Sequence, residues 1–224
     1  MLQNMTEGEP LKLIIPFMVP LLIGNVFQQL YNIADVVIVG RTIGVEALAT
    51  VGSVTPLFMM TMVLTIGLSN GCTVVTGQRY GAGDMGGMRR SIGTCTVLSV
   101  LFTLLIMLVF HMIIDPALVL MNIPPELLED AKAYVMIIVD GLFAMMGYNL
   151  LSGIMRSLGD SKTPLYFLIV SSVVNIALAL FFILVLGWGV PGSAVALVIA
   201  QAISAILCLA YIYKRFPQLH LKRK

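Results

Sequence analysis

Residues 91–113 read SIGTCTVLSVLFTLLIMLVFHMI, a long apolar run without Asp, Glu, Lys or Arg. A helix rises about 1.5 Å per residue, so a run of this length spans a hydrocarbon core roughly 30 Å thick. Similar runs occur at residues 13–39, 54–77, 131–155, 164–186 and 191–213. The pattern predicts six transmembrane helices, separated by Gly- and Pro-rich turns at residues 40–44, 80–87, 115–125, 159–164 and 187–192.

The composition supports the same conclusion. Of the 224 residues, 59% are hydrophobic and 11% are charged, with a mean hydropathy of +1.01, whereas soluble domains carry about 25% charged residues. Membrane-spanning β-strands are short and alternate in hydrophobicity, which these continuous runs do not. We therefore expect an all-α polytopic membrane protein, with one six-helix lobe over residues 1–213 and a basic tail over residues 214–224.

The basic residues predict the orientation of the helices. Lys and Arg favour the cytoplasmic side of short loops. If the N-terminus is inside, only Arg41 and Lys132 lie outside, and the acidic connection at 115–130 also faces out. Both termini are then cytoplasmic at the cell membrane. The eleven basic residues expected inside are Lys12, Arg79, Arg89, Arg90, Arg156, Lys162, Lys214, Arg215, Lys222, Arg223 and Lys224.

The histidines, cysteines and glycines of this sequence do not have the spacing typical of enzymes or metal sites. His111 and His220 have neither metal-ligand nor catalytic-triad spacing, and there is no phosphate-binding Gly-rich loop. Cys72, Cys95 and Cys208 are odd in number and lack Cys-x-x-Cys spacing. The small net charge of +2 makes nucleic acid an unsuitable partner. We expect no enzymatic activity and no cofactor.

The first run carries a polar stripe within the predicted membrane span. Its five members project within about a third of the helix circumference. Facing lipid would cost them several kcal/mol by desolvation, at roughly 2 kcal/mol or more per group, so they must face other helices or a wet cavity. Hydrogen bonding between helices and contact with substrate both remain open for the amides. The stripe consists of Asn25, Gln28, Gln29, Asn32 and Asp35.

Asp35 is the residue of this stripe that favours function. An acidic residue inside a span is normally retained for ion or proton handling. Pro16 and Pro20 remove backbone hydrogen bonds from the same helix and predispose it to bend. The sequence therefore predicts that Asp35 couples the protonation or cation state to a change in shape.

Asp140 is a second acidic candidate, in the fourth run. Either it lies inside the span as a cavity residue, or the helix begins later and Asp140 lies at the outer interface. Its nearest cation in the sequence is Lys132, two turns earlier. Asn149 could line the same cavity, although such residues also simply pack helices together. The same two interpretations hold for Ser152, Ser171, Ser172, Asn175, Gln201 and Ser204.

A second stripe follows the helical period in the second run. Thr61, Thr65, Ser69 and Thr73 recur every four residues and share one face. Because small side chains let membrane helices approach closely, this stripe predicts packing against a neighbour.

Two stretches of the chain resemble the multidrug and toxic compound extrusion (MATE) transporters. The first contains QQLYNIAD at residues 28–35, VGR at 39–41 and ALATVG at 47–52. The second is RSLGDSKTP at 156–164, continuing through Asn175 to GVPG at 189–192. Together they cover essentially the whole chain in the family's order.

The resemblance implies two six-helix lobes that face each other across a central cavity. Such a protein exchanges a drug-like or metabolite substrate against sodium ions or protons. This chain resembles the N-terminal lobe alone, and its end resembles the start of the linker between lobes. A second copy of the chain or a separate C-terminal lobe is then the expected partner, beside the lipid bilayer.

The resemblance also implies a cation site. Asp35 and Asn175 match the first-helix aspartate and the fifth-helix asparagine of many relatives. The positions of a second carboxylate and of a threonine are occupied by Ala179 and Leu197. Two oxygen ligands are therefore absent, which favours proton over sodium coupling unless Asp140 supplies the second carboxylate.

Two other functions remain open. A lone lobe that transports nothing would be a truncated chain or a structural partner, and a purified monomer without a partner would favour it. A lipid-linked sugar flippase of the wider superfamily would need a strongly cationic cavity. The cavity candidates named above are amides and acids, so the flippase ranks below efflux.

Overall fold

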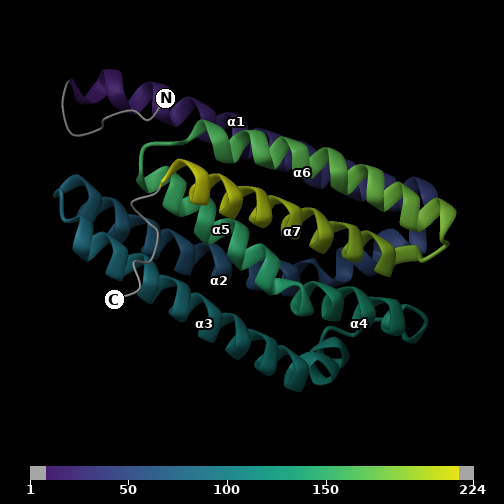
Figure 1. Ribbon diagram of the computed structural model, residues 1–224. Helices are drawn as coiled ribbons and strands as arrows, with labels where there is room; N and C mark the ends of the chain where they lie inside the picture. Colours follow the sequence, from purple (N-terminus) through teal and green to yellow (C-terminus); the bar gives the residue numbers. More distant parts are fainter. Residues whose placement is uncertain (1–8, 217–224) are drawn as a thin grey trace.

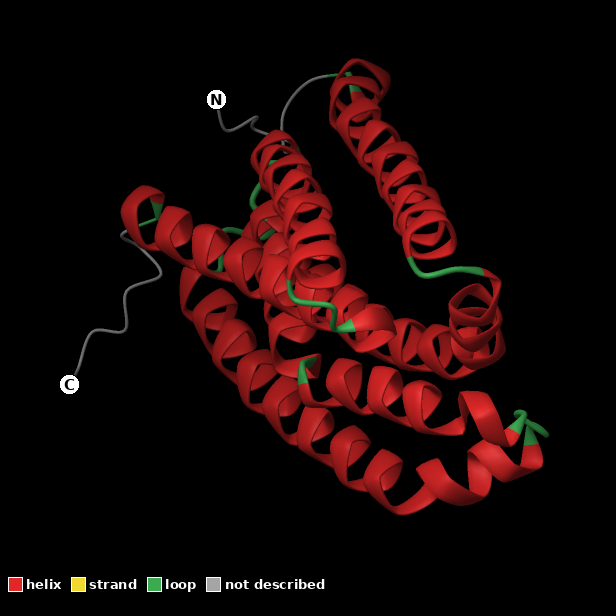
Figure 2. Ribbon diagram, turned by 90° about the vertical axis from the view of Figure 1, so that its right-hand side faces the viewer, coloured by secondary structure: helices red, strands yellow, loops and turns green. Residues whose placement is uncertain are grey.

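The computed structural model describes residues 9–216 and confirms the all-α class within that range (Figure 1). Short loops join the helices (Figure 2). The last part of the predicted tail, residues 217–224 with His220, lies outside the described residues. The elements are α1 (Pro10–Thr42), α2 (Val45–Gly81), α3 (Met85–Leu120), α4 (Pro125–Asp140), α5 (Leu142–Ser157), α6 (Lys162–Leu180), a π-helical turn η1 (Phe181–Val185) and α7 (Gly189–Arg215).

Five of the described helices are each long and apolar enough to cross a membrane, with α6 and η1 forming one span. The pair α4 and α5, which bend by 44° at a break, is the candidate for a sixth crossing. The prediction of one continuous helix over residues 131–155 was therefore wrong. The break lies at Gly141, where a side chain would collide with Val198 of α7. The close approach of α7 requires glycine at this position. Glycine is also a residue at which helices commonly kink.

The helix α3 extends beyond its predicted end. The pair Asp115-Pro116 was expected to open a turn, but both residues lie inside the helix, which continues to Leu120. The carboxylate of Asp115 forms an ion pair with Lys132 of α4, with 2.5 Å between Oδ1 and Nζ. The connection between α3 and α4 is therefore shorter than expected and covers residues 121–124.

The bundle is elongated, with helices running between two ends. One end, called here the termini end, holds the start of α1 and the end of α7 (Figure 1). It also holds the α2–α3 and α5–α6 turns, and the other end is called the far end. Each of these two turns has a glycine with positive φ, Gly83 at 73° and Gly159 at 87°, a conformation that glycine adopts without strain.

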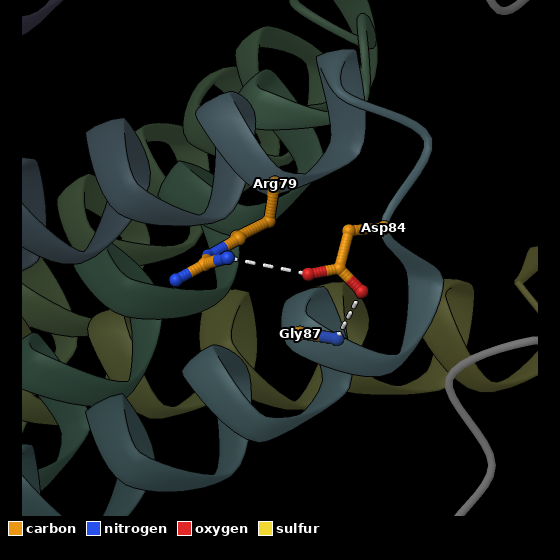
Figure 3. Close-up of polar contacts among 3 residues, drawn as sticks. All are labelled: Arg79, Asp84 and Gly87. Atoms are coloured by element: carbon orange, nitrogen blue, oxygen red, sulfur yellow. Dashed lines mark hydrogen bonds and ion pairs between the residues drawn. The ribbon is translucent and has the colours of Figure 1, made fainter.

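In each turn the next residue is an aspartate that caps the following helix. The carboxylate of Asp84 accepts a hydrogen bond from the backbone N–H of Gly87 at 2.8 Å and pairs with Arg79 at 3.3 Å (Figure 3). The carboxylate of Asp160 accepts from the N–H of Thr163 at 3.0 Å. Both aspartates thus satisfy a free donor in the first turn of a helix.

The core is built around α2, α5 and α7. Thr61, Thr65 and Ser69 are buried on the face of α2 that packs against α5, which confirms the predicted packing stripe. Each of these three hydroxyls donates to a carbonyl of its own helix and is therefore paired. The hydroxyl of Ser69 also lies 3.6 Å from the sulfur of Met146 on α5.

The helix α1 packs chiefly against α6 and leaves a long apolar face open. A soluble protein rarely exposes a continuous apolar face of this extent, so lipid or another protein must cover it. The exposed side chains of this face are Leu22, Val26, Leu30, Ile33 and Val37.

Candidate transport cavities

Four of the five polar residues of α1 line two cavities inside the lobe. Gln28 lines both, and Gln29 is the exception, exposed and hydrogen-bonded to Asn32 at 3.3 Å. The Asp35 cavity, about 180 Å³, is lined by Gln28, Tyr31, Asn32, Asp35, Val36, Val51, Thr55, Phe58, Met59, Met62, Tyr134, Met145, Leu197 and Gln201. The Arg156 cavity, about 200 Å³, is lined by Pro20, Leu21, Gly24, Asn25, Gln28, Tyr148, Asn149, Ser152, Arg156, Ser161, Pro164, Leu165 and Leu168.

The carboxylate of Asp35 is the most polar group of the first cavity. Its Oδ1 is buried and has no hydrogen-bond partner among the described residues, and the same is true of Oε1 of Gln201. A buried acceptor without a partner costs about 1–3 kcal/mol. A proton or a cation that bound to Asp35 would relieve that cost at its carboxylate.

Two tyrosines accompany Asp35 and were not identified from the sequence. Tyr31 and Tyr134 both interact electrostatically with the carboxylate. Tyr31 precedes Asp35 by one helical turn, so the period of α1 could have revealed it. Tyr134 comes from α4, and only the packing of α4 against the core brings it to α1.

One part of the Asp35 cavity wall consists of flexible apolar side chains. Met59 and Met62 of α2 and Met145 of α5 line it together with Phe58. Thioether side chains are flexible and polarisable, and they adapt to ligands of different shape. An apolar cavity with a few polar groups at one side is the usual form of a small-molecule site.

The two expected cation ligands, Asp35 and Asn175, do not line the same cavity. Asn175 lies on α6, is 1% exposed, and neither polar atom of its side chain has a hydrogen-bond partner among the described residues. It is not part of the lining of the Asp35 cavity and makes no hydrogen bond with Asp35. Leu197 does line that cavity, and Ala179 is completely buried.

The cavity role predicted for Asp140 is not supported by its position. Asp140 is the last residue of α4 at the break, and its side chain is 58% exposed. Its Oδ1 lies 3.4 Å from Nε2 of His111 on α3, and Lys132 pairs with Asp115 instead. Neither cavity includes Asp140. His111 was expected at the end of a span. Because α3 continues past residue 113, His111 lies within the helix and contacts Asp140.

Arg156 is the functional candidate that the sequence analysis missed. It was assigned to a cytoplasmic loop, but it lies on α5 and lines the second cavity with Asn149 and Ser152. Residues 149, 152 and 156 are spaced by three and four and share one helix face, which was the available signal. The amide of Asn149 donates to the carbonyl of Met145 at 2.9 Å, and Asn25 reaches the same cavity from α1.

Known proteins with a similar sequence identify the family to which this architecture belongs. Residues 20–181 match the MatE family model. The chain is 34% identical over 205 residues to the probable multidrug resistance protein YoeA of Bacillus subtilis, covering 89% of this chain and 44% of that protein. It is 28% identical over 214 residues to the probable multidrug resistance protein NorM of Thermotoga maritima, covering 91% of this chain and 45% of that protein.

Solved structures agree with the sequence relatives. A crystal structure of MATE in the bent conformation superposes with a TM-score of 0.88 at 30% identity, covering 96% of this chain and 48% of that chain. An outward-facing multidrug resistance MATE transporter of the MOP superfamily gives 0.89, covering 95% and 47%. The chain spans about half the length of the curated relatives and of these structures. As the sequence resemblance predicted, this multi-pass membrane protein belongs to the MatE family, the multidrug and toxic compound extrusion transporters.

Proposed function

We propose that this chain is one lobe of a secondary active transporter that exports drug-like or metabolite molecules in exchange for a cation. The observation that carries the proposal is the Asp35 cavity, where a buried carboxylate oxygen without a partner faces a Met-rich apolar wall. An apolar molecule and a proton or cation can both be accommodated there. The names of the relatives, which are described as probable multidrug resistance proteins, support this direction.

A proton fits the Asp35 cavity better than a sodium ion. Sodium needs several hard oxygen ligands, and Leu197 brings hydrocarbon to a position where relatives supply a threonine. A proton needs one basic oxygen, which Asp35 provides. Asn175, buried on α6 and without a hydrogen-bond partner among residues 9–216, remains the second candidate of the coupling site. We therefore favour proton antiport, with sodium as the alternative.

The proposed transporter needs a second lobe. Relatives are about twice as long, and α1 leaves an apolar face open beside its polar stripe. A second copy of this chain or a separate C-terminal lobe would cover that face and enclose the substrate. A lobe that remains alone would transport nothing, and this is the competing function.

The proposed orientation has the termini end in the cytoplasm of the cell. Among the described residues, this end carries eight basic residues and the far end carries two, Arg41 and Lys132. The excess follows the rule that basic residues remain on the cytoplasmic side. The eight are Lys12, Arg79, Arg89, Arg90, Arg156, Lys162, Lys214 and Arg215.

The test is transport of a fluorescent cationic dye into proteoliposomes under an imposed pH gradient, with and without sodium. The expected result is dye movement that the pH gradient drives and sodium does not change. Light scattering on the same purified sample gives the number of copies. Dye movement driven only by a sodium gradient would reverse the choice of ion. A monomer that moves no dye under either gradient would contradict transport by this chain alone.

A further inference from the structure

Arg156 is a cation inside the lobe without an acidic partner. Its Nε donates to the carbonyl oxygen of Ser152 at 3.3 Å, and no ion pair is formed with it within residues 9–216. The titratable groups that interact with it electrostatically are Tyr148 and Cys208, which carry no negative charge at neutral pH. Since a guanidinium is always charged, the charge in this position is not compensated by the described protein.

Other basic residues of the termini end differ from Arg156. Arg79 pairs with Asp84, and Arg89, Arg90 and Lys162 are exposed to solvent. Arg156 is half-buried and lies between two cavities, because it also lines a neighbouring space of about 310 Å³ bordered by α1, α2 and the α5–α6 turn. Among the residues that the structure describes, no Asp or Glu lines either space.

Further hydrogen-bond donors line the same cavity as the guanidinium. Asn25 and Gln28 of α1 contribute amides, and Ser152 and Ser161 contribute hydroxyls to the Arg156 cavity. A cation and several neutral donors together suit an oxyanion.

We propose that the Arg156 cavity binds a carboxylate or phosphate group, either from the headgroup of an anionic lipid or from a soluble anion. The cavity lies near the termini end of the bundle, where both lipid headgroups and soluble anions can reach it. Basic pockets between membrane helices are known to bind lipid headgroups. Arg156 forms the ion pair, and Asn25 and Asn149 orient the oxyanion. The Asp35 cavity, which shares Gln28, remains the separate acidic site.

This inference goes beyond the proposed function, since it concerns equilibrium binding and holds whether or not the chain transports. The test uses the full chain in detergent and measures retained lipid by native mass spectrometry, with phosphatidylglycerol as the anionic lipid and phosphatidylcholine as the neutral one. Inorganic phosphate and acetate are then added as soluble competitors. The variants are Arg156→Gln, Arg156→Lys and Asn25→Asp, and Arg90→Gln is the control because it removes an equal charge from an exposed position.

The expected result is that the wild type prefers phosphatidylglycerol and that Arg156→Gln weakens its binding by about tenfold. Arg156→Lys should retain part of it, and Arg90→Gln should match the wild type. Asn25→Asp keeps the arginine and the helix intact but supplies an internal carboxylate, so it should also lose the anion. Displacement by phosphate or acetate, or binding of these ions without lipid, would identify a soluble anion as the natural occupant.

Equal binding of both lipids together with no binding of phosphate or acetate would overturn the proposal. So would an Arg90→Gln variant that loses as much binding as Arg156→Gln. A failed dye-transport assay leaves these binding results unchanged, so the two proposals can fail separately.

Discussion

Gly153 of α5 lies directly against the hydroxyl of Thr73 on α2, and a methyl group at Gly153 would overlap that oxygen. The backbone carbonyl of Ser69 lies 3.6 Å from the same point. The hydroxyl of Thr73 donates to the carbonyl of Ser69 at 2.8 Å, so rotating the side chain away would break this hydrogen bond. The contact sets how closely the two central helices approach.

The first prediction concerns this contact. Gly153→Ala should destabilise the protein by about 1–3 kcal/mol because the core is overpacked. Thermal unfolding in detergent measures the effect. The double variant Thr73→Ala/Gly153→Ala should recover most of the loss, and Gly71→Ala on α2 is the control, since nothing lies near its added methyl. Equal stability of Gly153→Ala and Gly71→Ala would contradict the contact.

The second prediction concerns the two acidic residues inside the predicted spans. Asp35→Asn should abolish dye transport, because an amide cannot take up and release a proton. Asp140→Asn should leave transport within about twofold, because Asp140 does not line the Asp35 cavity and contacts His111 instead. Transport that survives Asp35→Asn would exclude Asp35 as the coupling residue, and loss in Asp140→Asn would return Asp140 to the cavity mechanism.

The third prediction separates two roles of Asp84. Asp84→Ala removes both the cap of α3 and the partner of Arg79, and should cost about 1 kcal/mol. Asp84→Asn keeps a capping oxygen and should lose only the exposed ion pair, within about 0.5 kcal/mol. Amide hydrogen exchange at Gly87 should rise in the alanine variant alone. Equal exchange in both variants would mean that the ion pair, not the cap, holds the turn.

The fourth prediction separates stability from coupling at Asn175. The buried side chain has no hydrogen-bond partner within the described residues, so Asn175→Leu, similar in size, should raise the unfolding temperature. Ser171→Ala, one turn earlier, removes a hydrogen bond to the carbonyl of Ala200 and should lower it. If Asn175 belongs to the coupling site, its leucine variant will be more stable and inactive. A less stable Asn175→Leu would show that the amide has a structural role.

Much of the fold follows from the sequence. The apolar runs predicted the all-α class and the position of the long membrane-crossing helices, because lipid demands internal hydrogen bonding and a minimum length. The polar stripe of α1 was also readable, since the period of a helix places Asn25, Gln28 and Asp35 on one side regardless of what surrounds them. Helix ends were less accurate: α3 continues through Asp115-Pro116 to Leu120, and the break at Gly141 lies where Val198 of α7 leaves no room for a side chain.

The sequence by itself determined that this chain crosses the membrane as helices and that Asp35 lies inside one of them. Only the tertiary structure decided which side chains meet: Tyr134 beside Asp35, His111 beside Asp140, and Arg156 within a cavity and not in a loop. The physical reason is that periodicity and hydropathy act between residues a few positions apart. The surroundings of a charge depend on how helices distant in the chain pack against one another.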